Sequence, residues 1–244
     1  MKRYGLIGCG IGGSLSPAMF RAAYPGLEYD LIDTDDFEYA FKLFLDRYEA
    51  VNVTAPFKEA AFSRVSCCDG ISRRIGAVNI LVHRGDTVLG YNSDYLAVRR
   101  IIESSGDMIK FPTAVVIGCG GAGKAAAAAA FDCGLDTVVA NRTVEHAALF
   151  CSRFAGMRPA GLGDVPGMLG GAGVVIYTLP VFSPVAALVD ALDGALRIEA
   201  SYTNPSLSSP GCIGGRRWLA NQAMAGFPLM PGMEPQQDAV CSVL

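Results

Sequence analysis

The 244-residue sequence contains few of the side chains that metal centres most often use. Histidine occurs only at His83 and His146, which excludes a histidine-rich metal site. The eight cysteines include no C-x-x-C pair, and no segment gathers four of them. Scattered single thiols in a chain of this length are typical of reduced cysteines rather than of a disulfide framework. We therefore expect no bound metal and a cytoplasmic location.

A surplus of charge is also missing. Lysine and arginine number 20 against 23 aspartates and glutamates, the net charge is −3, and no basic block occurs. Because nucleic-acid binding needs a concentrated positive face, we expect no nucleic-acid partner. Only 18% of the residues are charged and 51% are hydrophobic, so the chain can bury a sizeable core, which excludes intrinsic disorder.

No hydrophobic run is regular enough to form a membrane helix. Val165–Val189 holds no charged residue, but Pro166, Pro180 and Pro184 would break any single helix there. We predict a short helix, a buried strand and a loop in this stretch. Near the N-terminus, glycines interrupt the apolar residues that follow Lys2-Arg3, so a secretory signal is not indicated. We expect a soluble protein with no membrane partner.

Short β-branched runs alternate with helix-period segments, which is typical of a parallel sheet built from βα units. The alternation becomes more regular from about residue 113. We predict an α/β protein of two domains: an α/β substrate domain (1–96 plus 219–244) and a Rossmann-type nucleotide domain with a doubly wound parallel sheet (97–218). Strands are expected near 3–8, 28–33, 50–54, 78–83, 87–90, 113–118, 137–140, 173–179 and 195–201. Helices are expected from 17 and over 36–48, 57–75, 92–105, 121–133, 143–154 and 185–192, and from 218 onward.

A glycine-rich loop predicts a dinucleotide site in the second half. Gly118-Cys119-Gly120-Gly121-Ala122-Gly123 matches G-x-G-x-x-G, directly follows the strand Ala114–Ile117 and opens an alanine-rich helix. Glycines in this context let backbone N–H groups approach a pyrophosphate at a helix N-terminus. The similar run Gly8–Gly13 also follows a strand, but the cleaner βαβ context favours the later loop. Alone, either run could be a simple turn.

The residues after the next strand favour NADP over NAD. An NAD site usually places a carboxylate there, whereas this strand ends in Asn141-Arg142-Thr143. A guanidinium can bind a 2′-phosphate through paired, charge-assisted hydrogen bonds. The alternative is a solvated Arg142 followed by Thr143 as a helix cap.

Polar clusters in the first half interrupt apolar segments. Ser14 and Ser16 precede a helix that begins with Pro17, where they could bind a carboxylate or merely cap the helix. Asn52-Val53-Thr54-Ala55-Pro56-Phe57-Lys58 follows a strand into a proline turn and puts Lys58 beyond the strand's carboxyl end. Asn92-Ser93-Asp94 begins the helix that connects the two predicted domains, and we expect these polar residues to lie close to the cleft between them. The alternative is a structural role, in which they supply a helix cap and a favourable carboxylate in the first turn.

Taken together, these segments resemble the shikimate dehydrogenase family over nearly the whole chain. Each motif is weak alone, but their shared order and spacing is specific. The matching segments are Ser14-x-Ser16-Pro17, Asn52-Val53-Thr54-x-Pro56-x-Lys58, Gly76-Ala77-Val78-Asn79, Gly90-x-Asn92-Ser93-Asp94, Gly118-x-Gly120-Gly121-Ala122, Asn141-Arg142-Thr143, Tyr202 and Gln222.

The resemblance implies an enzyme that reduces 3-dehydroshikimate to shikimate with NADPH, in aromatic amino-acid biosynthesis. It implies that Lys58 and Asp94 form the catalytic pair. The implied substrate-binding residues are Ser14, Ser16, Thr54, Asn79, Tyr202 and Gln222, with Asn52 in support. The implied cofactor-binding residues are Gly118, Gly120, Gly121, Ala122, Asn141, Arg142 and Thr143.

The chain departs from the family's pattern at several of these segments. Ser93 replaces a threonine, His146 an arginine, Glu199 an aspartate, and Arg217-Trp218-Leu219 a Gly-Met-Leu. His146 leaves one fixed cation for the 2′-phosphate.

Two alternatives to the leading interpretation stay open at this stage: a quinate or shikimate dehydrogenase that uses NAD, and a non-catalytic sensor of a shikimate-like ligand on the same fold. The sequence fits either a monomer or a homodimer.

Overall fold

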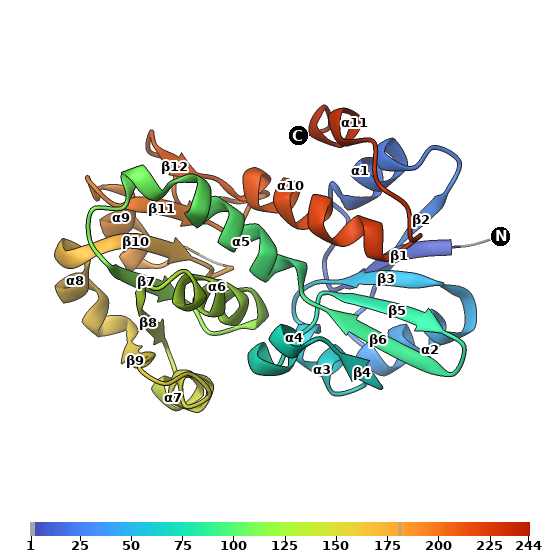
Figure 1. The fold of residues 1–244 in the computed structure, drawn as a ribbon, viewed down its shortest axis with the longest axis horizontal. Helices are drawn as coiled ribbons and strands as arrows, with labels where there is room; N and C mark the ends of the chain where they lie inside the picture. Colours follow the sequence, from blue (N-terminus) through green and yellow to red (C-terminus); the bar gives the residue numbers. More distant parts are fainter. Residues whose placement is uncertain (1–2, 181) are drawn as a thin grey trace. The chain divides into compact units, whose positions relative to one another are not determined.

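The computed structural model describes residues 3–180 and 182–244. The chain divides into two compact units (Figure 1). One comprises the residues up to Ser93 together with Gln222–Leu244, and the other comprises Asp94–Asn221. These borders lie three residues before and three residues after those expected from the sequence, at 96/97 and 218/219. Each unit contains one six-stranded sheet.

The first sheet has the strand order β2-β1-β3-β5-β6-β4. Strands β1 (Arg3–Gly8), β2 (Glu28–Asp33) and β3 (Ala50–Val53) are parallel, as predicted. Strand β5 (Ile80–Arg84) runs antiparallel to β3 and to β6 (Thr87–Tyr91), so this half of the sheet is not the expected parallel one. The antiparallel pairing of β5 with β6 follows from the two-residue turn at Gly85 (φ +57°), because so short a connection can join only antiparallel strands.

The helical residues expected over 57–75 are confirmed at both ends of this stretch, but the middle of the stretch is not helical. The chain forms α3 (Lys58–Phe62), the short strand β4 (Cys67–Cys68) and α4 (Gly70–Ile75). Strand β4 pairs in parallel with β6 at the sheet edge. Asp69 then caps α4, accepting a 2.6 Å hydrogen bond from the Ser72 N–H. A local helical pattern is overridden here by a tertiary strand partner.

Aromatic side chains cover the first sheet. Helix α2 (Phe37–Arg47) buries its apolar stripe against β1 and β3, in a cluster that contains Phe37, Phe41 and Phe44. A separate aromatic cluster joins α1 (Ser16–Ala23) to the sheet and to η4 (Phe227–Leu229), with Phe20 at 4.7–5.2 Å from the rings of Tyr4, Tyr29 and Phe227. Helix α11 (Gln237–Cys241) packs on α1.

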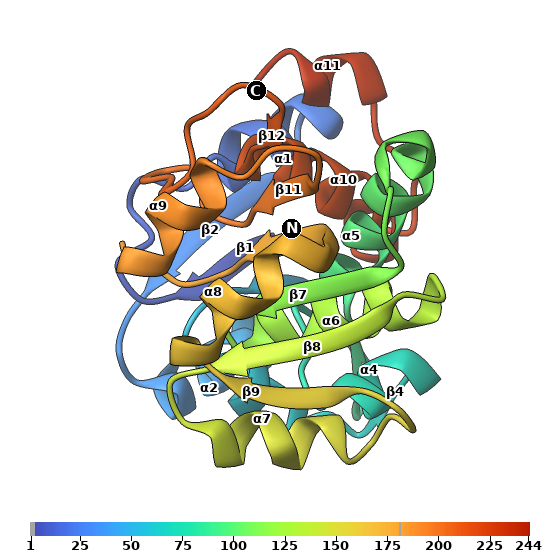
Figure 2. The ribbon, with the colours of Figure 1, turned by 90° about the vertical axis from the view of Figure 1, so that its left-hand side faces the viewer.

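The second sheet has the order β12-β11-β10-β7-β8-β9 with every pair parallel, which is the doubly wound arrangement predicted. Figure 2 shows α8 in front of this sheet and α6 behind it. The strands are β7 (Thr113–Ile117), β8 (Asp136–Asn141), β9 (Arg158–Gly161), β10 (Ala172–Tyr177), β11 (Leu196–Glu199) and β12 (Cys212–Ile213). The helices of this unit are η1 (Gly106–Met108), α6 (Gly121–Asp132), α7 (Val144–Cys151), η2 (Leu162–Asp164), α8 (Val165–Met168), η3 (Leu169–Gly171) and α9 (Pro184–Asp190).

Two helices cross the border between the units: α5 (Ser93–Ser104) and α10 (Gly215–Gly226). In the stretch Val165–Val189, the helix α8 and the buried strand β10 appear as predicted. Within the described residues, no helix is long and apolar enough to cross a membrane.

Candidate functional site

The loops that follow β1 and β3 lie side by side at one edge of the first sheet. The chain goes from β1 to β2 on one side and then to β3 on the other, which makes this edge a topological switch point. Hydrogen bonds join the two segments, from the Cys9 N–H to the Ala55 carbonyl (3.3 Å) and from the Thr54 N–H to the Ile7 carbonyl (2.9 Å). Ser14 and Ser16 follow β1, and Thr54 and Lys58 follow β3. Ligands bind at such positions in open α/β sheets.

Ser16 is not the cap of α1. The N-cap position is occupied by Leu15, and Ser16 is the first residue of the helix, with Pro17 next to it. The Ser14 hydroxyl accepts a 3.2 Å hydrogen bond from the Ser16 N–H and so acts on the helix start. Ser16 itself is buried. The capping alternative is therefore wrong for Ser16, and its hydroxyl stays a candidate for carboxylate binding.

Lys58 is held by its backbone beside a buried asparagine. It begins α3, and its carbonyl accepts a 3.0 Å hydrogen bond from the Val78 N–H. The next residue, Asn79, is buried, and its backbone carbonyl accepts a hydrogen bond from the Val53 N–H (2.8 Å). The ends of β3, α3 and the segment before β5 are thus fixed to one another.

A buried hydrogen-bond network joins three sequence-distant residues of the first unit. The Ser93 N–H donates to the Asn79 Oδ1 (2.8 Å), and the Asn79 amide donates to the Ser93 hydroxyl (3.0 Å). The Ser93 hydroxyl also bonds the Gln222 Oε1 at 3.2 Å. The structure therefore brings the predicted residues Asn79 and Gln222 together through Ser93. Asn52 supports them, because its amide donates to the Asn79 carbonyl (3.4 Å) while its Oδ1 accepts from the Tyr29 hydroxyl (2.8 Å).

Asp94 follows Ser93 in the first turn of α5 and is buried. Its Oδ1 accepts a 2.9 Å hydrogen bond from the indole Nε1–H of Trp218 on α10. The expected approach of Asp94 to Lys58 stays a prediction, since the two residues belong to different units.

The Gly118 loop has the geometry that a dinucleotide needs. It connects β7 to α6, and the sheet changes winding direction between β7 and β10. Gly118 has φ +108°, and a Cβ on Gly123 would lie 2.1 Å from the Gly118 carbonyl oxygen. Both positions therefore require glycine for the turn and for close packing. At Gly120, the N-cap of α6, no described atom lies within 4 Å of such a Cβ, so the backbone faces space that a pyrophosphate could fill.

The earlier glycine run differs from this loop in one decisive respect. The Asp33 carboxylate at the end of β2 accepts hydrogen bonds from the N–H groups of Gly10 (2.7 Å) and Ile11 (3.0 Å). A carboxylate already bonds the amides that would face a phosphate, and its charge would repel one. This contact supports the choice of the Gly118 loop as the nucleotide site.

The residues after β8 lie next to the start of α7. The Asn141 amide donates to the Thr143 carbonyl (2.9 Å), and Arg142 is exposed. Thr143 occupies the N-cap position of α7, but its side chain makes no capping hydrogen bond in the described structure. The Cys119 thiol, 3.8 Å from the His146 carbonyl, ties the Gly118 loop to this turn. An adenosine 2′-phosphate bound there would meet Arg142, which fits NADP.

Tyr202 lies in the loop after β11, which a buried glutamate organises. Glu199 is fully buried, and its carboxylate accepts hydrogen bonds from the N–H groups of Ser201 (3.0 Å), Ser206 (3.0 Å) and Leu207 (3.1 Å). Burial raises the pKa of this carboxyl above its usual range, and the three hydrogen bonds oppose that shift. Binding of the substrate carboxylate by Tyr202 stays a prediction, because it lies in the second unit.

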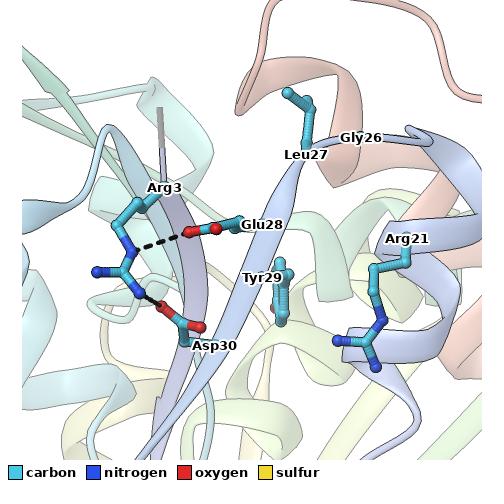
Figure 3. A pocket seen from close by; sticks show the side chains of 7 residues that line it. All are labelled: Arg3, Arg21, Gly26, Leu27, Glu28, Tyr29 and Asp30. Carbon is cyan, nitrogen blue, oxygen red and sulfur yellow. Dashed lines mark ion pairs between the residues drawn. The ribbon is translucent and has the colours of Figure 1, made fainter. Parts of the chain in front are cut away.

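An open cavity of about 470 Å³ lies at the other end of the first sheet (Figure 3). Arg3 begins β1 and pairs there with Glu28 (3.3 Å) and Asp30 (3.1 Å) of β2. Because β1, β2 and β3 are parallel, this cavity is at the amino ends of the strands, opposite Ser14 and Lys58. Among the described residues, no group of three or more His, Cys, Asp or Glu is arranged to hold a metal.

Comparison with known proteins places these features in a family. The model of the "Shikimate dehydrogenase substrate binding domain" matches residues 6–81. A shikimate dehydrogenase (NADP(+)) of Halobacterium salinarum is 37% identical over 84% of this chain and 80% of its own length. That of Natronomonas pharaonis is 35% identical over 100% of both chains. The structure of shikimate 5-dehydrogenase from Thermus thermophilus, in complex with NADP(H) and shikimate, has a TM-score of 0.82 at 26% identity and covers 100% of each chain. The chain therefore belongs to the shikimate dehydrogenase family.

Proposed function

We propose that this chain is an NADP-dependent shikimate dehydrogenase, which transfers a hydride reversibly between NADPH and 3-dehydroshikimate in aromatic amino-acid biosynthesis. One observation carries the proposal. The same chain has a G-x-G-x-x-G loop at the switch point of the second, doubly wound sheet, and it has Ser14, Ser16 and Lys58 at the switch point of the first sheet. The likeness to shikimate dehydrogenases (NADP(+)) over 84–100% of this chain supports the same reaction.

The proposed substrate site is formed mainly by the first unit. Ser14 and Ser16, together with Tyr202, bind the substrate carboxylate. The ring oxygens are bound by Lys58, Asn79, Asp94 and Gln222, with Thr54 in support. The buried network of Asn79, Ser93 and Gln222 holds its amide groups in fixed orientations, which suits the recognition of hydroxyl groups at defined positions.

Lys58 and Asp94 form the proposed catalytic pair. Bound NADPH supplies the hydride, and negative charge then develops on the ketone oxygen of the substrate. The Lys58 ammonium stabilises that charge and donates the proton, an effect worth about 10²–10⁴-fold in general acid catalysis. The Asp94 carboxylate orients the ammonium and accepts a hydrogen bond from the adjacent ring hydroxyl. In the oxidation direction, Lys58 accepts the proton instead.

The proposed cofactor site uses Gly118, Gly120, Gly121 and Ala122 for the pyrophosphate. Gly118 and Gly120 precede α6, and Gly121 and Ala122 are its first two residues, where the helix dipole favours an anion. Arg142 binds the 2′-phosphate, and Asn141 and Thr143 shape the turn that presents it. His146 lies in the first turn of α7, at a position where a fixed cation in place of the imidazole would strengthen the preference for NADP.

We also propose that the enzyme works in the cytoplasm, as a monomer or a homodimer, without a nucleic-acid partner. None of the eight cysteines, all of them within the described residues, forms a disulfide, which suits a reducing compartment.

One assay tests the proposed reaction. Purified protein is mixed with shikimate or quinate and with NADP⁺ or NAD⁺, and formation of the reduced nicotinamide is followed by absorbance. We expect the highest kcat/KM with shikimate and NADP⁺. A preference for quinate with NAD⁺ would replace this proposal by the related dehydrogenase, and measurable ligand binding without any turnover would identify a sensor.

An Arg142→Ala variant should raise KM for NADP⁺ about tenfold or more and leave KM for NAD⁺ nearly unchanged. Arg100→Ala, which removes another exposed arginine, is its control.

A further inference from the structure

The only tryptophan of the chain is buried against the proposed catalytic carboxylate. Trp218 is 4% exposed and Asp94 is 5% exposed, and the indole Nε1–H lies 2.9 Å from the Asp94 Oδ1. An indole has one donor and no acceptor, so this contact can only be N–H donating to carboxylate. The bond joins residues 124 positions apart in the sequence.

Two side chains on one face of α10 form hydrogen bonds with two consecutive residues of α5. Trp218 and Gln222 are four positions apart, so their side chains lie on one face of the helix. Trp218 bonds Asp94, and Gln222 accepts a bond from Ser93 (3.2 Å). Because Ser93 is also bonded to Asn79, the first turn of α5 is held on both sides.

We propose that Trp218 is a positioning residue that sets the orientation of the Asp94 carboxylate for catalysis. This inference rests on the proposed function. With Oδ1 held by a charge-assisted hydrogen bond, the carboxyl group can no longer rotate freely about its Cβ–Cγ bond, and Oδ2 keeps one direction. Preorganisation of this kind lowers the reorganisation needed when the substrate hydroxyl and Lys58 are to be engaged together. Holding the carboxylate also compensates for its loss of water on burial.

The first test replaces the donor with as little change of shape as the chain allows. Since the chain has one tryptophan, growth with β-(3-benzothienyl)alanine changes position 218 alone and puts sulfur in place of the N–H. Trp218→Phe is the genetic counterpart. We expect kcat for shikimate oxidation to fall about 10- to 100-fold in both proteins, with the dissociation constant of NADP⁺ changed less than twofold.

The matched control is Tyr95→Phe. The Tyr95 hydroxyl also donates from a buried aromatic ring to a carboxylate, that of Asp132 (3.0 Å), and it lies one residue from Asp94. If loss of such a bond acts only through stability, Tyr95→Phe and Trp218→Phe should lose kcat to the same small extent. A positioning role predicts that only the Trp218 substitutions lower kcat.

The second test reads the bond directly. A ¹⁵N-labelled sample has a single indole N–H resonance, and we expect it to move when shikimate is added and to move again in Asp94→Asn. A hydrogen bond with a purely structural role would show no change in this resonance when shikimate is added.

Two results would overturn the positioning role while leaving the proposed function intact: normal kcat in the benzothienyl protein, or an indole resonance of an active enzyme that does not move when shikimate is added. If the unmodified protein does not oxidise shikimate at all, the proposed function fails, and this role fails with it.

Discussion

The Asp33 carboxylate accepts a 2.7 Å hydrogen bond from the Gly10 N–H. This contact distinguishes the glycine-rich loop after β1 from the similar loop at Gly118. In a dinucleotide site, an acidic residue at the end of the second strand bonds the ribose hydroxyls. Here it bonds the loop that follows the first strand. The contact holds the backbone that leads to Ser14 and Ser16, and it already occupies two of the amides that a phosphate would need.

Removing the carboxylate of Asp33 should therefore affect the substrate and not the cofactor. We expect Asp33→Ala to lower the free energy of unfolding by about 1–2 kcal/mol, since two backbone donors lose an ionised acceptor. KM for shikimate should rise several-fold, and the dissociation constant of NADP⁺ should not change. Kinetics, calorimetry and urea unfolding measure the three quantities. Asp35→Ala, at a nearby exposed carboxylate, is the control; tighter binding of NADP⁺ by Asp33→Ala would contradict this account.

Lys58 should contribute to turnover far more than to binding. We expect Lys58→Ala to lower kcat by about 10²–10⁴-fold, because the developing charge on the substrate oxygen loses its proton donor. The dissociation constant of shikimate should change much less. Stopped-flow and steady-state assays give both values, with Lys42→Ala on the exposed side of α2 as the control. A Lys58→Ala enzyme with near-normal kcat would remove this residue from the mechanism.

Substitution by alanine should affect different properties at two glycines of the Gly118 loop: cofactor affinity at Gly120 and stability at Gly118. Gly120 faces open space, so Gly120→Ala should leave Tm unchanged and weaken NADP⁺ binding about tenfold or more by occupying the space of the pyrophosphate. Gly118 has φ +108°, and a Cβ there would lie 2.5 Å from the Thr178 Oγ1. Gly118→Ala should therefore lower the stability by about 1–2 kcal/mol or more. Thermal unfolding and calorimetric titration with NADP⁺ distinguish the two; normal cofactor affinity in Gly120→Ala would place the pyrophosphate elsewhere.

Asp190 should make the segment around Ser208 and Ser209 sensitive to acid. The backbone N–H of Ser209 and that of Ser208 each donate to the Asp190 Oδ1 at 2.8 Å. These hydrogen bonds, that of Ser209 first, hold the pKa of Asp190 below its ordinary value of 3.8. Since the folded state favours the charged form, the stabilisation is complete above pH 3.8 and is lost as the pH falls through the lower, folded-state pKa.

We accordingly expect Asp190→Asn to unfold at lower urea concentration than the unmodified protein at neutral pH. The difference should shrink as the pH falls below about 3.8 and disappear below the lower, folded-state pKa of Asp190, where neither protein carries a charge at this position. Urea unfolding curves over a series of pH values measure this, with Asp193→Asn at an exposed neighbour as the control. A stability difference that does not depend on pH would show that the charge of Asp190 is irrelevant.

The second sheet was more predictable than the first. Each of its central strands belongs to a βα unit whose pattern is contained in about 30 consecutive residues, so β7, α6, β8 and β10 could be found locally. The edge strands β9 and β12 were missed, because β9 contains Pro159 and β12 has only two residues. In the first sheet, the direction of β5 depends on its pairing with β3, a strand that lies far from it in the sequence. The pairing of β4 with β6 could not be inferred from the local helical pattern at 57–75.

The site shows the same division. Ser14, Lys58 and the Gly118 loop could be singled out because each belongs to a short motif next to a strand. The part played by Trp218 could not, although its spacing of four residues from Gln222 was a signal that the two share a helix face. Glu199 and Asp33 were likewise not recognised as loop-holding carboxylates, since their partners are backbone N–H groups that carry no sequence information.

The sequence alone indicated an α/β fold of two units, the Gly118 loop as the candidate nucleotide site, and the family, because periodicity and short motifs are properties of neighbouring residues. The tertiary structure decided which polar groups meet: Trp218 with Asp94, Ser93 with Asn79 and Gln222, and Asp33 with the first glycine loop. A hydrogen bond acts over about 3 Å, so it depends on the packing of elements up to 129 residues apart, and no local pattern encodes that distance.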